Sequence, residues 1–379
     1  MRVALVHDHL TQDGGAERVL AVLQELFPRA PIYTLVYDKS KMRTVFQPER
    51  VRTSFLQKVP FVHQKFEWLF PFMPLATESY DLSEFDMVLS SSSAFSKGVI
   101  TKSTTLHLCY CHTPTRYLWS DTHSYVKELL VPQFMKRIVP LFLNPIRQWD
   151  RLVADRVDSF IANSKTVQER IKKYYRRNSD VIYPPVEVDQ FFPGEGSGTY
   201  YLAGGRLVSY KRFDIVVEAF NRIGLPLKIF GSGPEFHRLS KRAKKNIVFL
   251  GHVSDAMRSE LYRGCIAYIN PQEEDFGITV IEAAASGRPV IALAAGGALE
   301  TVIENVTGTF FYDQDAPALI DAILRLKPEQ FNPQHIREHA VRYSSNRFKK
   351  EIGDYISKKW AQWEEVQHMK RLRQTKLSV

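Results

Sequence analysis

The feature that most constrains this chain is a strand, a glycine-bearing turn and a helix in succession, which occurs at the N-terminus and again around residue 200. The stretch VALVHDHL is typical of a buried strand, and TQDGGAERVLAVLQELF places a glycine turn before a helix with apolar residues at helical spacing. The stretch TYYLAGGRLVSYKRFDIVVEAFNRI repeats this unit. Further short strands alternate with helical segments, which is typical of parallel sheets. We therefore predict an α/β chain with two similar halves.

Length and composition support a division into domains. The chain has 379 residues, whereas single hydrophobic cores stop growing near ~250 residues. Residues 179–198 are rich in Pro and Gly, as a hinge is, and we place the boundary at Phe192. We expect an N-terminal domain over residues 1–192 and a C-terminal domain over 193–345. The segment 346–379 reads as one long helix or two, and we expect it to cross back to the N-terminal domain.

Several classes of protein are disfavoured by the sequence. The stretch before His7 is too short for the apolar part of a signal peptide, and no run approaches the ~18 apolar residues of a membrane span. We therefore expect a cytoplasmic protein. The three cysteines, Cys109, Cys111 and Cys265, lack the spacing of a structural zinc site and are expected to be buried free thiols.

The formal charge of +10 indicates an acidic partner: a phosphate-bearing small molecule, an anionic membrane surface or nucleic acid. Basic residues cluster in two runs, 165–177 and 366–379. A nucleic-acid-binding protein would be expected to carry a recognised reading module or basic residues interleaved with aromatic ones. The stretch IKKYYRR is a faint version of the second pattern, so we expect no nucleic-acid partner and keep that class as an alternative.

Two cations lie on a turn that favours an anion. Arg206 and Lys211 follow a strand and precede a helix, where backbone N–H groups and the helix N-terminus attract negative charge. Glycine turns recur at FGSGPE and AAGGALET, where the N–H groups of Gly296, Gly297 and Ala298 are expected to add to a phosphate site. Because turns after parallel strands meet at one edge of the sheet, a nucleotide diphosphate is the predicted ligand.

Two carboxylates stand eight residues apart in QEEDFGITVIEAAASG. Glu274 falls in a turn after a strand, and Glu282 falls in an apolar helix, where a carboxylate needs either a ligand or a partner. Three interpretations are open from the residues alone: a glycosidase pair, a metal site and a ligand clamp. Asp275 is the only further metal ligand nearby, and Glu273 is expected to lie at the surface.

The N-terminal half offers fewer candidates. Gly14 and Gly15 permit a ligand to approach the backbone closely. His112 follows the strand TLHLCY at its carboxyl end, although a lone histidine is more often structural than catalytic. No G-x-S-x-G motif supports a serine nucleophile.

At these residues the sequence resembles the family 4 glycosyltransferases, which are retaining enzymes of the GT-B fold. The resemblance implies two Rossmann-like domains that face a central cleft, with a sugar transferred from a nucleotide diphosphate donor. It implies that Glu274 contacts the donor sugar, that Glu282 binds the ribose hydroxyls, and that Arg206 and Lys211 bind the diphosphate. The donor-binding positions that it implies further are Gly14, Gly15, Val253, Phe276, Gly277 and Ile278. His112 is implied to lie beside the donor sugar, which makes His112, Glu274, Arg206 and Lys211 the candidate catalytic residues.

Three stretches are similar to those of bacterial mannosyltransferases: HDHLTQDGGAERVL, CHTPTRYLW and VIYPPVEVDQF. These relatives use GDP-mannose to build lipid-linked O-antigen, other lipopolysaccharide or exopolysaccharide. The resemblance implies an alpha-mannosyltransferase that needs no metal or other cofactor, since Arg206 and Lys211 would stabilise the departing diphosphate. A UDP-sugar donor stays open because the shared motifs do not identify the sugar, and a nucleotide-sugar epimerase or phosphorylase is the alternative enzyme class.

The stretch 61–80, FVHQKFEWLFPFMPLATESY, is dense in aromatic residues. If exposed it suits a membrane interface, and otherwise it belongs to the core. A lipid-linked acceptor would favour an exposed apolar surface together with the basic run 165–177, since anionic headgroups attract Lys and Arg. We therefore expect peripheral association with the inner face of the cell membrane.

Overall fold

The computed structural model describes residues 1–42, 45–62, 66–122, 126, 133–194, 196 and 198–377. The chain forms two compact units: unit 1 is Met1–Tyr183 with Phe348–Val379, and unit 2 is Pro184–Arg347. The division after Tyr183 precedes the boundary predicted at Phe192. The segment between them stays with unit 2 because Val186 pairs with the far end of that unit: its N–H donates to the carbonyl of Tyr343 (2.9 Å).

Unit 1 is built on a parallel sheet whose order is β3-β2-β1-β4-β5-β6-β7. Its strands are β1 Val3–His7, β2 Ile32–Thr34, β3 Val51–Thr53, β4 Met87–Ser92, β5 Leu106–Cys111, β6 Ser159–Ala162 and β7 Ser179–Val181. The central strands β1, β4 and β5 are buried along their whole length, as apolar runs covered on both faces should be.

The helices of unit 1 surround this sheet. They are α1 Gly15–Leu26, α3 Met73–Glu78, α5 Gln133–Val153, α6 Lys165–Arg170 and the π-helix η8 Ile171–Tyr175, and shorter 3₁₀ turns are η1 Lys39–Lys41, η2 Pro48–Arg50, η3 Phe55–Lys58, η4 Phe66–Phe72, η5 Ser96–Gly98, η6 Arg116–Leu118 and η7 Ala154–Arg156. Ser164 is the N-cap residue of α6, and its hydroxyl accepts from the N–H of Val167 at 3.1 Å.

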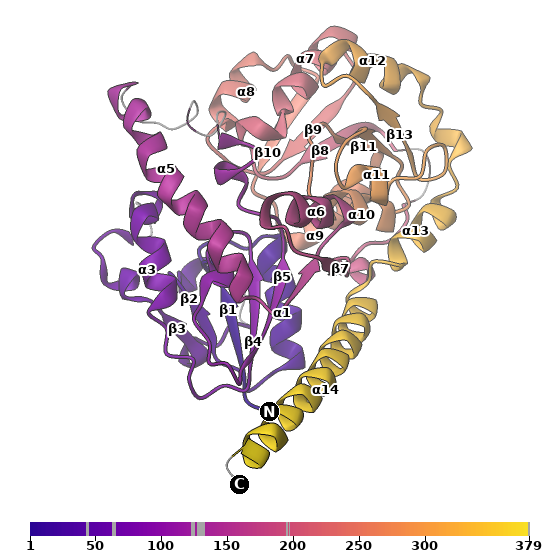
Figure 1. Cartoon of the computed structure of the whole chain (residues 1–379). Coiled ribbons are helices and arrows are strands. Elements are labelled where there is room, and N and C mark those ends of the chain that lie inside the picture. The colour runs from indigo at the N-terminus through magenta and orange to yellow at the C-terminus, as the bar shows by residue number, and fades with distance from the viewer. Residues whose placement is uncertain are drawn as a thin grey trace. The chain divides into compact units, whose positions relative to one another are not determined.

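The C-terminal segment is a single helix, α14 (Ser345–Leu377). Phe348, Ile352 and Ile356 on one side of it are buried in the core that α1 and the sheet of unit 1 form. Figure 1 shows α14, in yellow, running past the N-terminus of the chain. The predicted return of this segment to the N-terminal domain is therefore confirmed, because the buried side chains of α14 lie in the core of unit 1.

Unit 2 contains a second parallel sheet, with the order β10-β9-β8-β11-β12-β13. Its strands are β8 Tyr200–Gly204, β9 Leu227–Phe230, β10 Ile247–Gly251, β11 Cys265–Asn270, β12 Val290–Leu293 and β13 Gly308–Phe311. In both sheets the first strand of the unit lies inside and the chain then turns back past it, which is the Rossmann order. The prediction of two Rossmann-like α/β domains is confirmed.

The helices of unit 2 are α7 Phe213–Ile223, α8 Phe236–Arg242, α9 Asp255–Arg263, α10 Ile278–Ala285, α11 Ala298–Thr301, α12 Ala316–Arg325 and α13 Pro333–Val341, with 3₁₀ turns η9 Val188–Gln190, η10 Ser209–Lys211 and η11 Pro328–Gln330. Figure 1 shows α7 and α12 side by side, and the two helices bury their apolar faces in one core with the sheet. The helix predicted at FDIVVEAFNRI is therefore confirmed as α7.

The three cysteines are buried and form no disulfide, as expected. Burial raises the pKa of Cys109 and of Cys265 to about 12, so neither thiol ionises near neutral pH. Across the described part of the chain, no helix is both long and apolar enough to span a membrane.

Candidate functional site

The carboxyl-terminal edge of the sheet in unit 2 brings four turns together. The turns follow β9, β8, β11 and β12, which are neighbours in that order in the sheet. Glycines let the turns approach one another: a Cβ on Gly231 would meet the carbonyl oxygen of Gly205 at 1.8 Å, and one on Gly296 would meet that of Glu274 at 2.3 Å. The glycines in FGSGPE and AAGGALET are thus required by close backbone contact between neighbouring turns.

Lys211 and Glu274 form an ion pair at this edge. Nζ of Lys211 lies 2.8 Å from Oε1 of Glu274, and the side chains keep 15% and 18% of their surface exposed. Burial alone would lower the pKa of Lys211, but the facing carboxylate outweighs it and the pKa lies above its ordinary value. Gln272 also donates to the same oxygen at 2.8 Å. The site therefore holds a fixed cation beside a fixed carboxylate.

Arg206 lies on the same turn as Lys211 and is exposed. Its Nη2 donates to the hydroxyl of Tyr210 at 3.0 Å. Arg206 lies two residues after the end of β8, and Lys211 ends the short η10 turn that follows. Arg206 and Lys211 together make this turn electropositive, as the diphosphate prediction requires.

Glu282 lies deeper, on α10, with 1% of its side chain exposed. Oε2 accepts from the hydroxyl of Tyr262 at 3.1 Å, and Nε of Arg258 lies 3.5 Å from the same oxygen. The expectation that a carboxylate in this apolar helix needs a partner is met by these two side chains from α9. Burial raises the pKa of Tyr262 well above its ordinary value, so its hydroxyl remains a donor to Glu282.

The residues between the two glutamates fix the start of α10. Gly277 has φ +93°, a left-handed conformation that glycine adopts without strain, and it precedes Ile278, which is half-buried. Phe276 is buried and its ring packs against that of Tyr343 at 5.5 Å. Glu273 is exposed, as expected. The turn thus presents Glu274 while Phe276 anchors it.

One predicted phosphate donor is already engaged within the protein. The N–H of Gly297 donates to the carbonyl of Glu274 at 2.8 Å, because the turns after β11 and β12 pair as an isolated bridge. The expectation that this N–H would serve a phosphate is therefore wrong. Val253 follows β10 and is half-buried. The adjacent Ser254 is the N-cap residue of α9, and its hydroxyl accepts from the N–H of Met257 at 3.2 Å.

In unit 1, His112 directly follows β5 and belongs to a hydrogen-bonded chain that the sequence did not predict. Its Nε2 lies 2.8 Å from Oγ of Ser91, and that oxygen lies 3.1 Å from Nδ1 of His7. Nε2 of His7 in turn faces Oε1 of Glu17 at 3.6 Å. The register pairs His7 of β1 with Ser91 of β4, so strand pairing assembles the chain. His112 is therefore a fixed side chain.

The carboxylate of Glu17 also holds the glycine turn before α1. The N–H of Gly14 donates to Oε2 of Glu17 at 2.9 Å, and Gly15 begins α1. Burial raises the pKa of Glu17, but the contact with His7 outweighs it and leaves the pKa below its ordinary value. Glu17 is consequently an anion that joins the Gly14–Gly15 turn to His7 and onward to His112.

Asp8 organises the neighbouring turn after β4. Its carboxylate accepts from four consecutive backbone N–H groups, at 2.6–2.9 Å; the donors are Ser93, Ala94, Phe95 and Ser96. His7 ends the strand VALVH and Asp8 directly follows it, and this position at a strand's carboxyl end was the only sequence signal for either residue. Among the described residues, no group of three or more His, Cys, Asp or Glu side chains is arranged to hold a metal ion.

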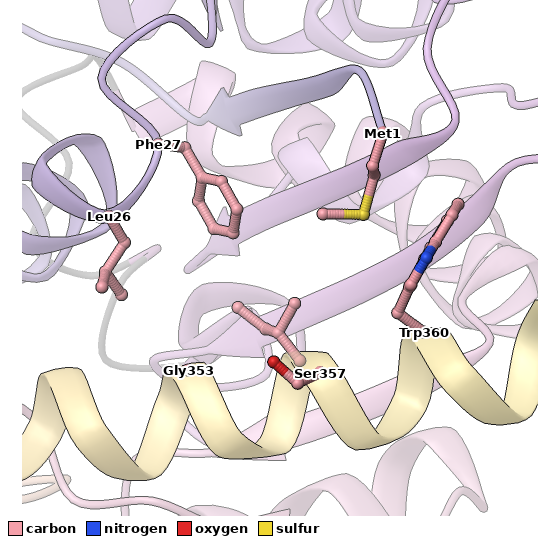
Figure 2. Close-up of a pocket in the computed structure, with 7 residues that line it drawn as sticks. Met1, Leu26, Phe27, Gly353, Ser357 and Trp360 are labelled. Carbon is pink, nitrogen blue, oxygen red and sulfur yellow. The ribbon is translucent and has the colours of Figure 1, made fainter.

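A pocket of about 330 Å³ lies elsewhere in unit 1, between the end of α1 and α14. Figure 2 shows Leu26 and Phe27 on one side and Gly353, Ser357 and Trp360 on the other, with Met1 between them. None of the predicted site residues lines this pocket, so it is separate from both groups of residues described above.

Two protein-family models match the chain over most of its length. Residues 13–190 match the model described as Glycosyltransferase Family 4, and residues 189–347 match Glycosyl transferases group 1. Together with the two Rossmann-like units, these matches define the chain as a GT-B glycosyltransferase of the group 1 and family 4 type.

Curated relatives show the same class at low identity. The chain is 28% identical over 174 residues to a glycosyltransferase of Methanocaldococcus jannaschii, covering 45% of this chain and 49% of the relative. It is 24% identical over 328 residues to the mouse alpha-1,3/1,6-mannosyltransferase ALG2, covering 75% of each. It is 28% identical over 207 residues to the O-antigen chain mannosyltransferase C of Escherichia coli, covering 51% of this chain and 55% of the relative. The matches with the first and third thus span about half of those relatives.

Solved structures support the fold. Anabaena HepE in complex with UDP superimposes with a TM-score of 0.68 at 17% identity, covering 94% of this chain and all of that one (100%). Sucrose-phosphate synthase from Thermosynechococcus elongatus gives 0.74 at 18% identity, covering 95% and 100%. At this identity the likeness establishes the fold.

Proposed function

We propose that this protein is a retaining, metal-independent alpha-mannosyltransferase that moves mannose from GDP-mannose to a lipid-linked glycan acceptor in the synthesis of bacterial surface polysaccharide. The observation that carries the proposal is the pair formed by Lys211 and Glu274, 2.8 Å apart beside Arg206, on adjacent turns of unit 2. This arrangement offers cations to a diphosphate and an acceptor carboxylate to sugar hydroxyls.

The chemistry assigned to these residues is electrostatic. The bond from the anomeric carbon of the sugar to the diphosphate oxygen breaks, and the acceptor hydroxyl oxygen bonds to that carbon on the same face. The hydroxyl proton passes to the departing phosphate oxygen. Lys211 and Arg206 stabilise the negative charge that grows on the diphosphate, and neither glutamate has to act as a base. The raised pKa of Lys211 keeps its ammonium charged at neutral pH.

The remaining residues are assigned to binding. We propose Glu274 for the sugar hydroxyls and Glu282 for the ribose, with Tyr262 and Arg258 holding its carboxylate in place. In unit 1 we propose His112 and the Gly14–Gly15 turn as ligand-facing groups. Glu17 supports this proposal because it lies between the two groups. Its carboxylate accepts from the N–H of Gly14 and faces His7, where the hydrogen bonds that lead to His112 begin.

The donor is proposed from the relatives. ALG2 and the O-antigen chain mannosyltransferase are named for mannose transfer, whereas HepE was solved with UDP and with UDP-glucose. GDP-mannose is therefore the first choice and a UDP-sugar the alternative.

A thermal-shift comparison tests the donor. We expect GDP and GDP-mannose at 100 times their dissociation constants to add ~2.7 kcal/mol to the stability of the folded protein, which raises the Tm by roughly 5 to 10 °C. UDP, UDP-glucose and UDP-GlcNAc should leave the Tm unchanged at the same concentration. A rise with UDP compounds alone would replace the donor. In a separate assay, release of GDP only when a glycan acceptor is present would distinguish transfer from epimerisation.

The lipid-linked acceptor and the membrane surface are proposed from unit 1. Within the stretch 61–80 the structure buries Met73 and Ala76 but leaves Phe61, Phe72 and Leu75 exposed, by 69%, 54% and 61%. Among the side chains of α5 that the structure describes, Leu141 (70%), Phe142 (53%) and Leu152 (68%) are exposed apolar residues. Because α3 and α5 share one core cluster, apolar side chains emerge from neighbouring helices. Lys172, Lys173 and Arg176 are exposed in the basic run.

Vesicle binding tests this surface. We expect the protein to sediment with anionic liposomes at low salt and to be released as salt rises, since each Lys or Arg near the surface contributes about 1 kcal/mol. Phe72→Ser combined with Leu141→Ser should weaken binding severalfold. Leu324→Ser is the matched control, because Leu324 is equally exposed (68%) but lies on α12 of unit 2. Negligible binding of the unaltered protein would remove the membrane from the proposal.

A further inference from the structure

The hydrogen-bonded chain in unit 1 has a direction that its end groups determine. It links His7, Ser91 and His112, in that order, and the carboxylate of Glu17 faces its His7 end. The serine hydroxyl has one hydrogen and two lone pairs, and among the described residues its hydrogen has no acceptor other than the two imidazoles, so Ser91 donates to one of them and accepts from the other. The chain can therefore run in only two senses, and each sense places the proton of His112 on a different ring nitrogen.

The charge of Glu17 selects between the two senses. Its carboxylate accepts from the N–H of Gly14 through Oε2 and faces Nε2 of His7 with Oε1, at 3.6 Å. That separation is long for a hydrogen bond, but a negative charge still favours an N–H over a lone pair facing it. When the ring of His7 holds a single proton, that proton lies on Nε2 and the lone pair of Nδ1 faces Ser91.

The hydroxyl of Ser91 then determines the direction of the two hydrogen bonds that it makes. Ser91 donates its hydrogen to Nδ1 of His7, 3.1 Å away, and is left to accept from Nε2 of His112, 2.8 Å away. Burial lowers the pKa of His112 to about 4, so its ring is neutral at physiological pH and has one proton to place. That proton lies on Nε2. Nδ1 of His112 makes no hydrogen bond within the described residues, and the side chain retains some exposure (8% for the residue).

We infer that Glu17, acting through His7 and Ser91, holds His112 as the Nε2–H tautomer, so that Nδ1 accepts a hydrogen bond from a ligand hydroxyl. Glu17, His7 and Ser91 are positioning residues. The role of Nδ1 toward a sugar or acceptor hydroxyl rests on the proposed function. The tautomer itself belongs to the free protein and stands apart from the donor.

The sharpest variant is Glu17→Gln. The N–H of Gly14 requires an acceptor, so the amide oxygen of the new side chain replaces Oε2 and its NH₂ group faces His7. Nε2 of His7 then accepts, Nδ1 donates to Ser91, and Ser91 donates to Nε2 of His112. One change of charge thus reverses every hydrogen bond in the chain and moves the proton of His112 to Nδ1.

Nitrogen-15 NMR of histidine-labelled protein at pH 8, without ligand, tests this inference. The signals of His112 are assigned by their loss in His112→Gln. We expect a pyridine-like shift at Nδ1 and a pyrrole-like shift at Nε2 in the unaltered protein, the reverse pattern in Glu17→Gln, and mixed tautomers in Ser91→Ala. Ser90→Ala is the matched control, because Ser90 pairs with His107 at 2.9 Å and should change that histidine alone.

A pyrrole-like Nδ1 of His112 in the unaltered protein would overturn the inference. So would an unchanged His112 pattern in both Glu17→Gln and Ser91→Ala. If one of these variants fails to fold, the other still decides the outcome. Because no nucleotide is present, failure here leaves the thermal-shift result untouched, and failure of that experiment leaves the tautomer assignment standing.

Discussion

Lys211→Ala is expected to lower kcat/KM for sugar transfer by about 100- to 1,000-fold, the loss that follows removal of one preorganised group that stabilises developing charge. Nζ of Lys211 is held 2.8 Å from Glu274 and remains charged, so the unaltered enzyme does not have to reorient this ammonium group during the reaction. The variant should also lose the thermal shift with GDP, because the diphosphate then lacks a cation in the ground state. Initial rates and melting curves of the purified protein measure both effects.

Stability must be separated from activity in this variant. Removal of Lys211 takes away the cation beside the carboxylate of Glu274, and the folded state loses some stability. The double variant Lys211→Met with Glu274→Gln removes both charges and should recover stability without recovering activity. Arg206→Ala tests the exposed cation, where activity should fall with little change in stability.

Lys228→Ala is the matched control. Lys228 is on β9 of the same unit, where its Nζ lies 3.7 Å from the centroid of the ring of Tyr200, the first residue of β8. We expect this variant to keep its activity and its response to GDP. Full activity in Lys211→Ala would contradict the diphosphate assignment.

The fold was predictable because central strands such as β1, β4 and β5 are short buried runs followed by turns, and helices such as α7 and α12 are amphipathic. Two repeats of that pattern are enough to specify two parallel sheets. The division between units was harder, because Pro and Gly occur both at Pro184 and around Phe192. The choice depends on pairing of Val186 with Tyr343, which are far apart in sequence. The amino-acid composition around the boundary does not indicate such a long-range contact.

The site was predictable where its signals are local. Glu274, Glu282, Arg206 and Lys211 stand out by charge on glycine turns or in an apolar helix. Their partners did not, because Tyr262 and Arg258 reach Glu282 from another helix. His7 and Ser91 were missed for a similar reason. Their contact depends on the register of β1 against β4, and neither residue is unusual in its own segment.

A buried ion pair away from the candidate site should dominate the stability of unit 1. Nζ of Lys97, on η5, lies 2.5 Å from Oδ1 of Asp150 on α5, and each side chain is 1% exposed. Asp150 also accepts from Thr115 at 2.8 Å and from the indole of Trp119 at 2.7 Å. Lys97→Met leaves that carboxylate buried without a cation, and we expect a loss of about 3 to 5 kcal/mol in the free energy of unfolding.

The contrast with a surface pair isolates burial as the cause. Lys349 and Glu25 are also 2.5 Å apart in unit 1 but keep 35% and 48% exposure, so Lys349→Met should cost less than about 1 kcal/mol. Adding Asp150→Asn to Lys97→Met should restore much of the loss, since the amide keeps an oxygen for Trp119 or Thr115 and carries no charge. Urea unfolding, followed by hydrogen exchange of amides in β4 and β5, measures unit 1 separately from unit 2. Equal losses in Lys97→Met and Lys349→Met would mean that solvent reaches Asp150, because a hydrated carboxylate loses little when its cation is removed.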